Sequence, residues 1–127
     1  MGWRARMPKL LVIEDEESSR ELYVDVLREE GYEVTAAANG LEAMLALEEQ
    51  DFDLIMTDLK MPEVDGGNLA VHYGHKRPDV PFVVVTAYRK FEEEVLRSAP
   101  NVKAYLVKPV DLEVLKETIR AALRPTG

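Results

Sequence analysis

The sequence has 127 residues, of which 46% are hydrophobic, so it suits a single globular domain and is not the sequence of a disordered chain. Its 16 basic and 24 acidic residues give a formal net charge of −8, which opposes direct binding to DNA or RNA. The absence of cysteine excludes disulfides, thiolate zinc sites and cysteine nucleophiles. No apolar run is long enough to span a membrane and residues 1–7 hold no apolar signal segment, so we expect a cytoplasmic protein.

Short apolar runs alternate with helical patterns along the chain. In chain order, the pattern predicts a strand over 9–13, a helix over 17–30 that ends at Gly31, a strand over 32–36, a helix capped by Asn39 and Glu42, a strand over 53–57, a short helix over 65–73, a strand over 81–86, a short helix over 91–97, a strand over 102–107 and a last helix capped by Asp111. The predicted inner faces are Leu22, Tyr23, Val26 and Leu27 in the first helix and Leu112, Leu115, Ile119 and Leu123 in the last.

Five strand–helix units with short connections predict an α/β domain, a parallel sheet with helices on both faces. Two strand orders are common for such a sheet: the flavodoxin-like order 2-1-3-4-5 and that of a dinucleotide-binding domain. The second needs a glycine-rich first turn, whereas residues 14–17 are all acidic and would repel a pyrophosphate. We therefore expect a flavodoxin-like five-stranded sheet.

Polar side chains follow four of the five predicted strands. Glu14 and Asp15 follow the first strand, Asp58 follows the third, Thr86 ends the fourth and Lys108 follows the fifth. With order 2-1-3-4-5 these four strands are neighbours, and open α/β sheets bind ligands at the carboxyl ends of their strands. We therefore expect three carboxylates, one hydroxyl and one ammonium group to meet in a single pocket.

This set of groups suits phosphoryl chemistry. Three close carboxylates repel one another unless a cation shares the site, and carboxylate oxygens together with water suit Mg²⁺. A carboxylate can attack phosphorus to give an aspartyl phosphate, a reaction that needs mainly positioning and neutralisation of oxygen charge. Mg²⁺, the Lys108 ammonium and the Thr86 hydroxyl would each meet one phosphoryl oxygen.

Four motifs stand in order along the chain: VIED at 12–15, MTDLKMPEVDG at 56–66, VVVTAY at 83–88 and YLVKP at 105–109. Together they closely resemble the receiver domain of bacterial two-component response regulators, a family that includes the chemotaxis receiver. The resemblance covers roughly residues 8–124. It implies a receiver domain over 8–124, an N-terminal extension over 1–7 and a tail or linker stub over 125–127.

The resemblance implies a role for individual residues. Asp58 is then the phospho-acceptor, with Lys108 and Thr86 as its catalytic partners. The implied Mg²⁺ ligands are Glu14, Asp15, Asp58 and the backbone carbonyl of Lys60, although many relatives have Asp where Glu14 stands. Thr86 and Tyr105 are implied to form a conformational switch, Lys60 and Tyr88 to slow the loss of the phosphoryl group, and Pro109 to follow a cis peptide bond.

The same resemblance implies a phosphorylation-dependent signalling switch and a regulatory domain rather than a turnover enzyme. A sensor histidine kinase or phosphotransfer protein would supply the phosphoryl group, and a downstream effector would read the change. The implied output face comprises the helix over 91–97, the strand over 102–107 and the last helix, and a homodimer through this face is left open. Neither nucleic acid nor membrane is an expected direct partner.

Each of these residues also has a plain structural explanation. Residues 14–17 suit the start of a solvated helix, Asp58 suits a turn, Lys108 suits the surface and Tyr105 suits the core or its rim. Two other functions stay open: a degenerate receiver that only binds other proteins, and a phosphohydrolase that works through an aspartyl phosphate. The phosphohydrolase pattern has a second Asp two residues after the first, where this chain has Lys60.

Overall fold

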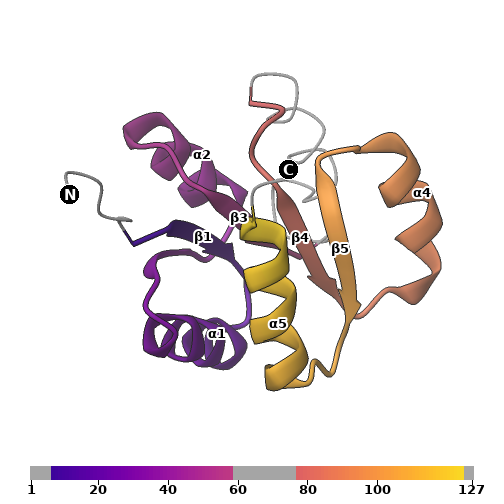
Figure 1. The fold of residues 1–127 in the computed structure, drawn as a ribbon, viewed down its shortest axis with the longest axis horizontal. Helices are drawn as coiled ribbons and strands as arrows, with labels where there is room; N and C mark the ends of the chain where they lie inside the picture. The colour runs from indigo at the N-terminus through magenta and orange to yellow at the C-terminus, as the bar shows by residue number, and fades with distance from the viewer. Residues whose placement is uncertain (1–6, 59–76, 125–127) are drawn as a thin grey trace.

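The computed structural model describes residues 7–58 and 77–124, and the strands in these ranges form one parallel sheet (Figure 1). The strands are β1 (Lys9–Ile13), β2 (Glu33–Ala37), β3 (Leu54–Thr57), β4 (Phe82–Thr86) and β5 (Val102–Val107). They are arranged in the order β2-β1-β3-β4-β5, and all neighbouring pairs are parallel. The predicted flavodoxin-like strand order is therefore confirmed.

Helices pack on both faces of this sheet (Figure 1). They are α1 (Glu17–Glu29), α2 (Gly40–Glu49), the 3₁₀ turn η1 (Arg89–Phe91), α4 (Glu92–Ser98) and α5 (Leu112–Leu123). The predicted helix over 65–73 lies outside the described residues. Among the helices that the structure describes, none is long and apolar enough to cross a bilayer.

The sheet separates two hydrophobic cores because successive strand residues point to opposite faces. Leu10 and Val12 of β1 pack with the residues of α1 and α5, whereas Leu11 and Ile13 pack with those of α2 and α4. The same alternation runs through β3 and β4, whose residues are all buried. Strands covered on both faces are apolar throughout, which explains the continuous apolar runs in the sequence.

Three predicted helix boundaries are confirmed. Gly31 follows α1 with φ of 95°, a conformation that glycine adopts at little cost, and its N–H donates to the Arg28 carbonyl. The Asn39 side chain accepts a hydrogen bond from the Glu42 N–H at 2.9 Å at the start of α2. The Asp111 side chain accepts from two backbone N–H groups at the start of α5.

The predicted inner face of α1 is wrong at one position. Leu22 is 46% exposed, and Val24 is buried in its place beside Tyr23, Val26 and Leu27. The buried face is centred between Tyr23 and Leu27, which puts Leu22 on the rim of the apolar stripe.

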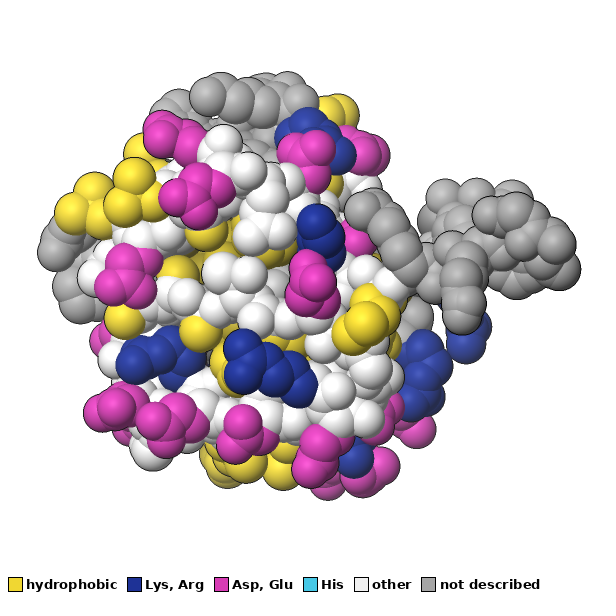
Figure 2. All heavy atoms as spheres, turned by 90° about the vertical axis from the view of Figure 1, so that its left-hand side faces the viewer, with side chains coloured by type: hydrophobic (Ala, Val, Ile, Leu, Met, Phe, Trp, Pro, Cys, Tyr) yellow, Lys and Arg dark blue, Asp and Glu magenta, His cyan; other side chains and the backbone are white. Residues whose placement is uncertain are grey.

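Three large apolar residues of α2 lie outside the core, although Ala46 and Leu47 pack against it. Leu41, Met44 and Leu45 are exposed, whereas the small residues Gly40 and Ala43 are buried against the sheet. Figure 2 looks onto the side of the molecule that is at the left in Figure 1, with acidic and basic side chains mixed over most of the surface and hydrophobic atoms gathered at its upper left.

Candidate functional site

The carboxyl ends of four neighbouring strands carry the polar side chains that the sequence singles out. Glu14 directly follows β1, Asp58 follows β3, Thr86 is the last residue of β4 and Lys108 follows β5. Glu14, Asp58 and Thr86 are buried, although the residue types are polar or charged. The fold therefore places a polar cluster at the carboxyl ends of strands whose bodies are mainly apolar.

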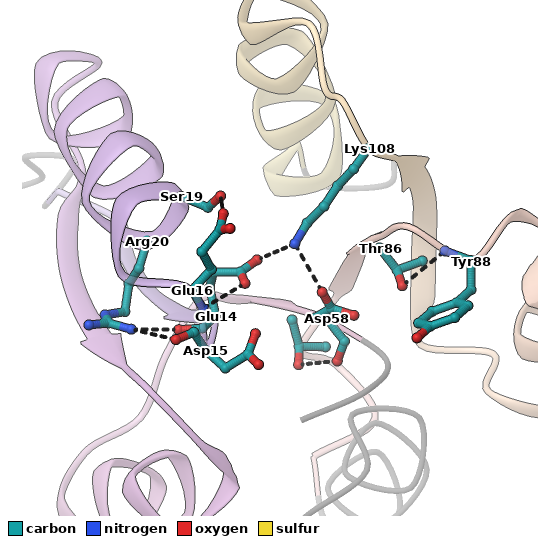
Figure 3. A network of polar contacts seen from close by, with 10 residues as sticks. Glu14, Asp15, Glu16, Ser19, Arg20, Asp58, Thr86, Tyr88 and Lys108 are labelled. Carbon is teal, nitrogen blue, oxygen red and sulfur yellow. Dashed lines mark hydrogen bonds and ion pairs between the residues drawn. The ribbon is translucent and has the colours of Figure 1, made fainter. Parts of the chain in front are cut away.

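Lys108 lies between two of the carboxylates (Figure 3). Its Nζ is 2.8 Å from Glu14 Oε1 and 3.1 Å from Asp58 Oδ2. Charged hydrogen bonds of this kind are stronger than neutral ones, and here each joins residues that are far apart in the sequence. Lys108 thus ties together the ends of β1, β3 and β5.

Burial and charge act on these groups in opposite directions. Burial by itself lowers the pKa of the Lys108 ammonium, but the hydrogen bonds to Glu14 and Asp58 outweigh burial and raise that pKa above the ordinary value for lysine. Burial raises the pKa of the Glu14 carboxyl, even though Lys108 and the Glu16 N–H lower it. Lys108 therefore stays protonated, and its single positive charge is shared between two carboxylates.

The turn after β1 is held by several hydrogen bonds. The Glu14 N–H donates to the Ala37 carbonyl at 3.0 Å, which extends the pairing of β1 with β2. The Glu16 N–H donates to Glu14 Oε2 at 3.1 Å, so that both carboxylate oxygens of Glu14 have a partner. In the next strand, the Asp58 N–H donates to the Ile13 carbonyl at 3.3 Å. These bonds fix the ends of β1 and β3 side by side.

Three carboxylates at this edge fit a metal ion. Glu14, Asp15 and Asp58 each offer one oxygen, and the three oxygens lie within 4.8 Å of one another. In an octahedral Mg²⁺ shell neighbouring oxygens are about 3.0 Å apart and opposite ones about 4.2 Å, so the three carboxylates would have to draw closer together to bind one ion directly. Asp15 is exposed, which leaves room for water ligands. The predicted Lys60 carbonyl ligand lies outside the described residues.

Thr86 connects to the predicted switch residue through the backbone of Tyr88. The Tyr88 N–H donates to Thr86 Oγ1 at 3.3 Å, and the Tyr105 hydroxyl donates to the Tyr88 carbonyl. Tyr105 is buried, and this burial raises the pKa of its phenol, as do the charges of Glu92 and Asp58. Of the two residues predicted to slow phosphoryl loss, Tyr88 is 39% exposed and Lys60 lies outside the described residues. The peptide bond between Lys108 and Pro109 is cis, as predicted.

Arg20 is the residue of this site that the sequence did not point to. Its guanidinium reaches back from α1 to the backbone carbonyls of Glu14 and Asp15 (Figure 3). A basic residue on the turn of a helix that follows an acidic segment was the available signal, but arginine is common on solvated helix faces.

The comparisons with known proteins cover nearly the whole chain. The family described as the response regulator receiver domain matches residues 10–120. The transcriptional regulatory protein ZraR of Klebsiella oxytoca is 33% identical over 117 residues, which is 92% of this chain and 26% of ZraR. The chain therefore spans about a quarter of the length of this curated relative.

Two similar solved structures contain magnesium. The response regulator TrrA of Thermotoga maritima, in complex with Mg²⁺ and BeF, is 33% identical with a TM-score of 0.83, and the match covers 91% of this chain and 99% of TrrA. The receiver domain of the sensor histidine kinase PA1611 of Pseudomonas aeruginosa, with magnesium in its active-site cleft, is 26% identical with a TM-score of 0.80, covering 92% of this chain and 98% of that domain.

Proposed function

The chain belongs to the family of response regulator receiver domains, and we propose that the carboxylate of Asp58 is its phospho-acceptor. Receiver domains are regulatory modules of two-component signalling. The observation that carries the proposal is the position of the Lys108 ammonium, 3.1 Å from Asp58 Oδ2 and 2.8 Å from Glu14 Oε1. This arrangement places a fixed positive charge beside the proposed acceptor.

The proposed reaction is attack of an Asp58 oxygen on the phosphorus of a phosphohistidine in a sensor histidine kinase or phosphotransfer protein. A new O–P bond forms as the P–N bond breaks, and the imidazole nitrogen keeps the electron pair. Because the transferred group carries its charge on three oxygens, catalysis depends on groups that are already in place to meet them. The Lys108 ammonium would pair with one oxygen and the Thr86 hydroxyl would donate to another.

Mg²⁺ is the cofactor that the acidic cluster fits, and TrrA and PA1611 support this choice. Glu14, Asp15 and Asp58 would hold the ion, which would neutralise charge on the incoming phosphoryl group. The exposed Asp15 would contribute a direct ligand, whereas Glu14 is also engaged by Lys108 and by the Glu16 N–H. The Lys60 carbonyl completes the proposed set.

The proposed output is a change in the surface formed by α4, β5 and α5. Movement of the Thr86 hydroxyl toward a phosphoryl oxygen would weaken its hydrogen bond with the Tyr88 N–H. Because the Tyr105 hydroxyl is hydrogen-bonded to the Tyr88 carbonyl, the change would reach Tyr105 through the backbone of Tyr88. Tyr88, together with the Lys60 side chain, would shield the phosphoryl group from water and slow its loss.

We assign the receiver domain to residues 8–124, with 1–7 and 125–127 as flanking segments, and an effector as the partner of its output face.

The deciding experiment exposes the protein to acetyl phosphate with and without Mg²⁺ and measures intact mass. We expect one phosphoryl adduct that requires Mg²⁺ and is lost in Asp58→Asn. Asp25→Asn is the matched control, since Asp25 is an exposed carboxylate on α1, and it should retain the adduct. If the wild-type protein gains no adduct under any condition, the chain is a degenerate receiver that acts by binding alone.

A further inference from the structure

The backbone carbonyls of Glu14 and Asp15 lie in the turn between β1 and α1. On the strand side of this turn, the Ile13 carbonyl, the last of β1, accepts from the Asp58 N–H at 3.3 Å. The Glu16 carbonyl accepts from the Arg20 N–H at 2.9 Å as the helix begins. The carbonyls of Glu14 and Asp15 come after the last hydrogen bond of the strand and before the first of the helix. The same two residues supply two of the three clustered carboxylates.

The Arg20 side chain meets these carbonyls. Its Nη1 donates to the Glu14 carbonyl at 2.9 Å and to the Asp15 carbonyl at 3.4 Å, and Figure 3 shows the guanidinium turned back from α1 toward both. Nη1 carries two N–H groups, so this one nitrogen can meet two successive carbonyls, and the shorter bond, to the Glu14 carbonyl, is the stronger of the two. Fixing these carbonyls restricts the backbone dihedral angles of Glu14 and Asp15, and therefore the directions of their side chains.

We propose that Arg20 is a positioning residue for the Mg²⁺ site, acting through the backbone of Glu14 and Asp15. The inference rests on the proposed function, because it assumes that these carboxylates hold Mg²⁺. Arg20 acts through the turn rather than on the ion or the phosphoryl group. Partners of this kind, which orient metal ligands without touching the metal, commonly change metal affinity by tenfold or more when they are removed.

The charge of Arg20 and its positioning role have opposite effects on Mg²⁺ affinity. A guanidinium near the carboxylates repels a divalent cation, so loss of its charge alone would strengthen Mg²⁺ binding. Loss of the two carbonyl contacts would let the turn move and would weaken binding. The sign of the change in Arg20→Met therefore separates the two effects.

The experiment is a Mg²⁺ titration of ¹⁵N-labelled protein followed by NMR amide shifts, which report affinity and folding together. For Arg20→Met we expect a dissociation constant on the order of tenfold higher than that of the wild type. Arg28→Met is the matched control, because Arg28 is also on α1 and donates to a backbone carbonyl, that of Val34, at 3.0 Å. Its Mg²⁺ affinity should equal that of the wild type.

A second measurement is the rate of phosphorylation by acetyl phosphate against Mg²⁺ concentration. Arg20→Met should need more Mg²⁺ for half-maximal rate and should approach the wild-type rate at saturation, whereas general destabilisation would lower the maximum. If Arg20→Met does not fold, Arg20→Lys decides: it keeps the charge on a shorter side chain, so a several-fold weaker affinity is expected and wild-type affinity would overturn the proposal.

Three outcomes overturn the role of Arg20: tighter Mg²⁺ binding in Arg20→Met, wild-type affinity in Arg20→Lys, which keeps the charge, or an equal loss of affinity in Arg28→Met. In each of these cases the wild type would still bind Mg²⁺ and gain its adduct, so the proposed function would stand. A wild-type protein that binds no Mg²⁺ would remove the proposed Mg²⁺-dependent function and the role of Arg20 together.

Discussion

Lys108 balances part of the charge of two buried carboxylates, Glu14 and Asp58, whose side chains are 2% and 9% exposed. A buried carboxylate without a partner is costly, because it loses its hydration and gains nothing in return. One ammonium group cannot neutralise three carboxylates, and burial raises the pKa of Glu14 despite the contact. The site thus keeps a net negative charge that a divalent ion can satisfy.

Lys108→Met should destabilise the protein more in EDTA than in Mg²⁺. Removing the ammonium takes away the partner that Glu14 and Asp58 share, which should lower the free energy of unfolding by about 2 kcal/mol. This is less than the loss expected for a fully buried pair, because Lys108 is partly exposed. Bound Mg²⁺ would replace part of the lost positive charge and reduce the difference. Urea denaturation in the two buffers measures both values.

Lys116→Met is the control for this comparison. Lys116 also pairs with a carboxylate, that of Glu113, but on the surface of α5. Its loss should leave the urea midpoint nearly unchanged in both buffers. An equal destabilisation of Lys108→Met in EDTA and in Mg²⁺ would argue that the ion does not share these carboxylates.

Glu14, Asp58 and Lys108 were predictable as site residues because each directly follows a strand. Once the strand order is known, position at a strand end is enough to bring Glu14, Asp58 and Lys108 together, whatever the details of packing. Arg20 was not predictable in this way. Its contact depends on how α1 leaves the turn and on the rotamer of a long side chain, neither of which the residue pattern encodes.

Among the helices, α1 and α2 show what periodicity can and cannot predict. The existence of both helices, the limits of α1 and the start of α2 were predictable, but which apolar residues face the sheet was not always so. In α2 the small residues Gly40 and Ala43 are buried, while Leu41 and Leu45 are exposed. Where a helix lies close to the sheet, only small side chains fit between them. The hydrophobicity of the residues does not show where this is the case.

The cap of α5 gives a prediction for this helix. Asp111 Oδ1 accepts from the Glu113 N–H at 2.8 Å and from the Val114 N–H at 3.2 Å. Asp111→Ala should lower the free energy of unfolding by about 1 kcal/mol, because these N–H groups lose their partner. Urea denaturation measures the loss, and Glu117→Ala, an exposed substitution within the same helix, should change stability far less. Equal effects would mean that the cap contributes nothing specific.

For the molecule as a whole, most of the stability and the proposed activity depend on different parts of the same strands. The bodies of β1, β3 and β4 are buried between two hydrophobic cores, and burial of this apolar surface is the main favourable contribution to folding. The carboxyl ends of the strands carry the charged groups instead. A change confined to an exposed charged group at that edge should therefore alter ion binding and leave the cores intact.

Mg²⁺ should accordingly stabilise the folded protein, and Asp15 should be required for this effect. An ion that binds only the folded state adds about 1.4 kcal/mol at ten times its dissociation constant, which for a chain of this size is a rise of roughly 5 °C in Tm. In Asp15→Asn the rise should be much smaller, since one exposed ligand is lost, while Tm in EDTA should not fall because Asp15 lies outside both cores. Thermal unfolding with and without Mg²⁺ tests this, with Ca²⁺ as a comparison ion of larger radius. A full Mg²⁺-dependent rise in Asp15→Asn would mean that the ion binds without this carboxylate, and a lower Tm in EDTA would mean that Asp15 supports the fold itself.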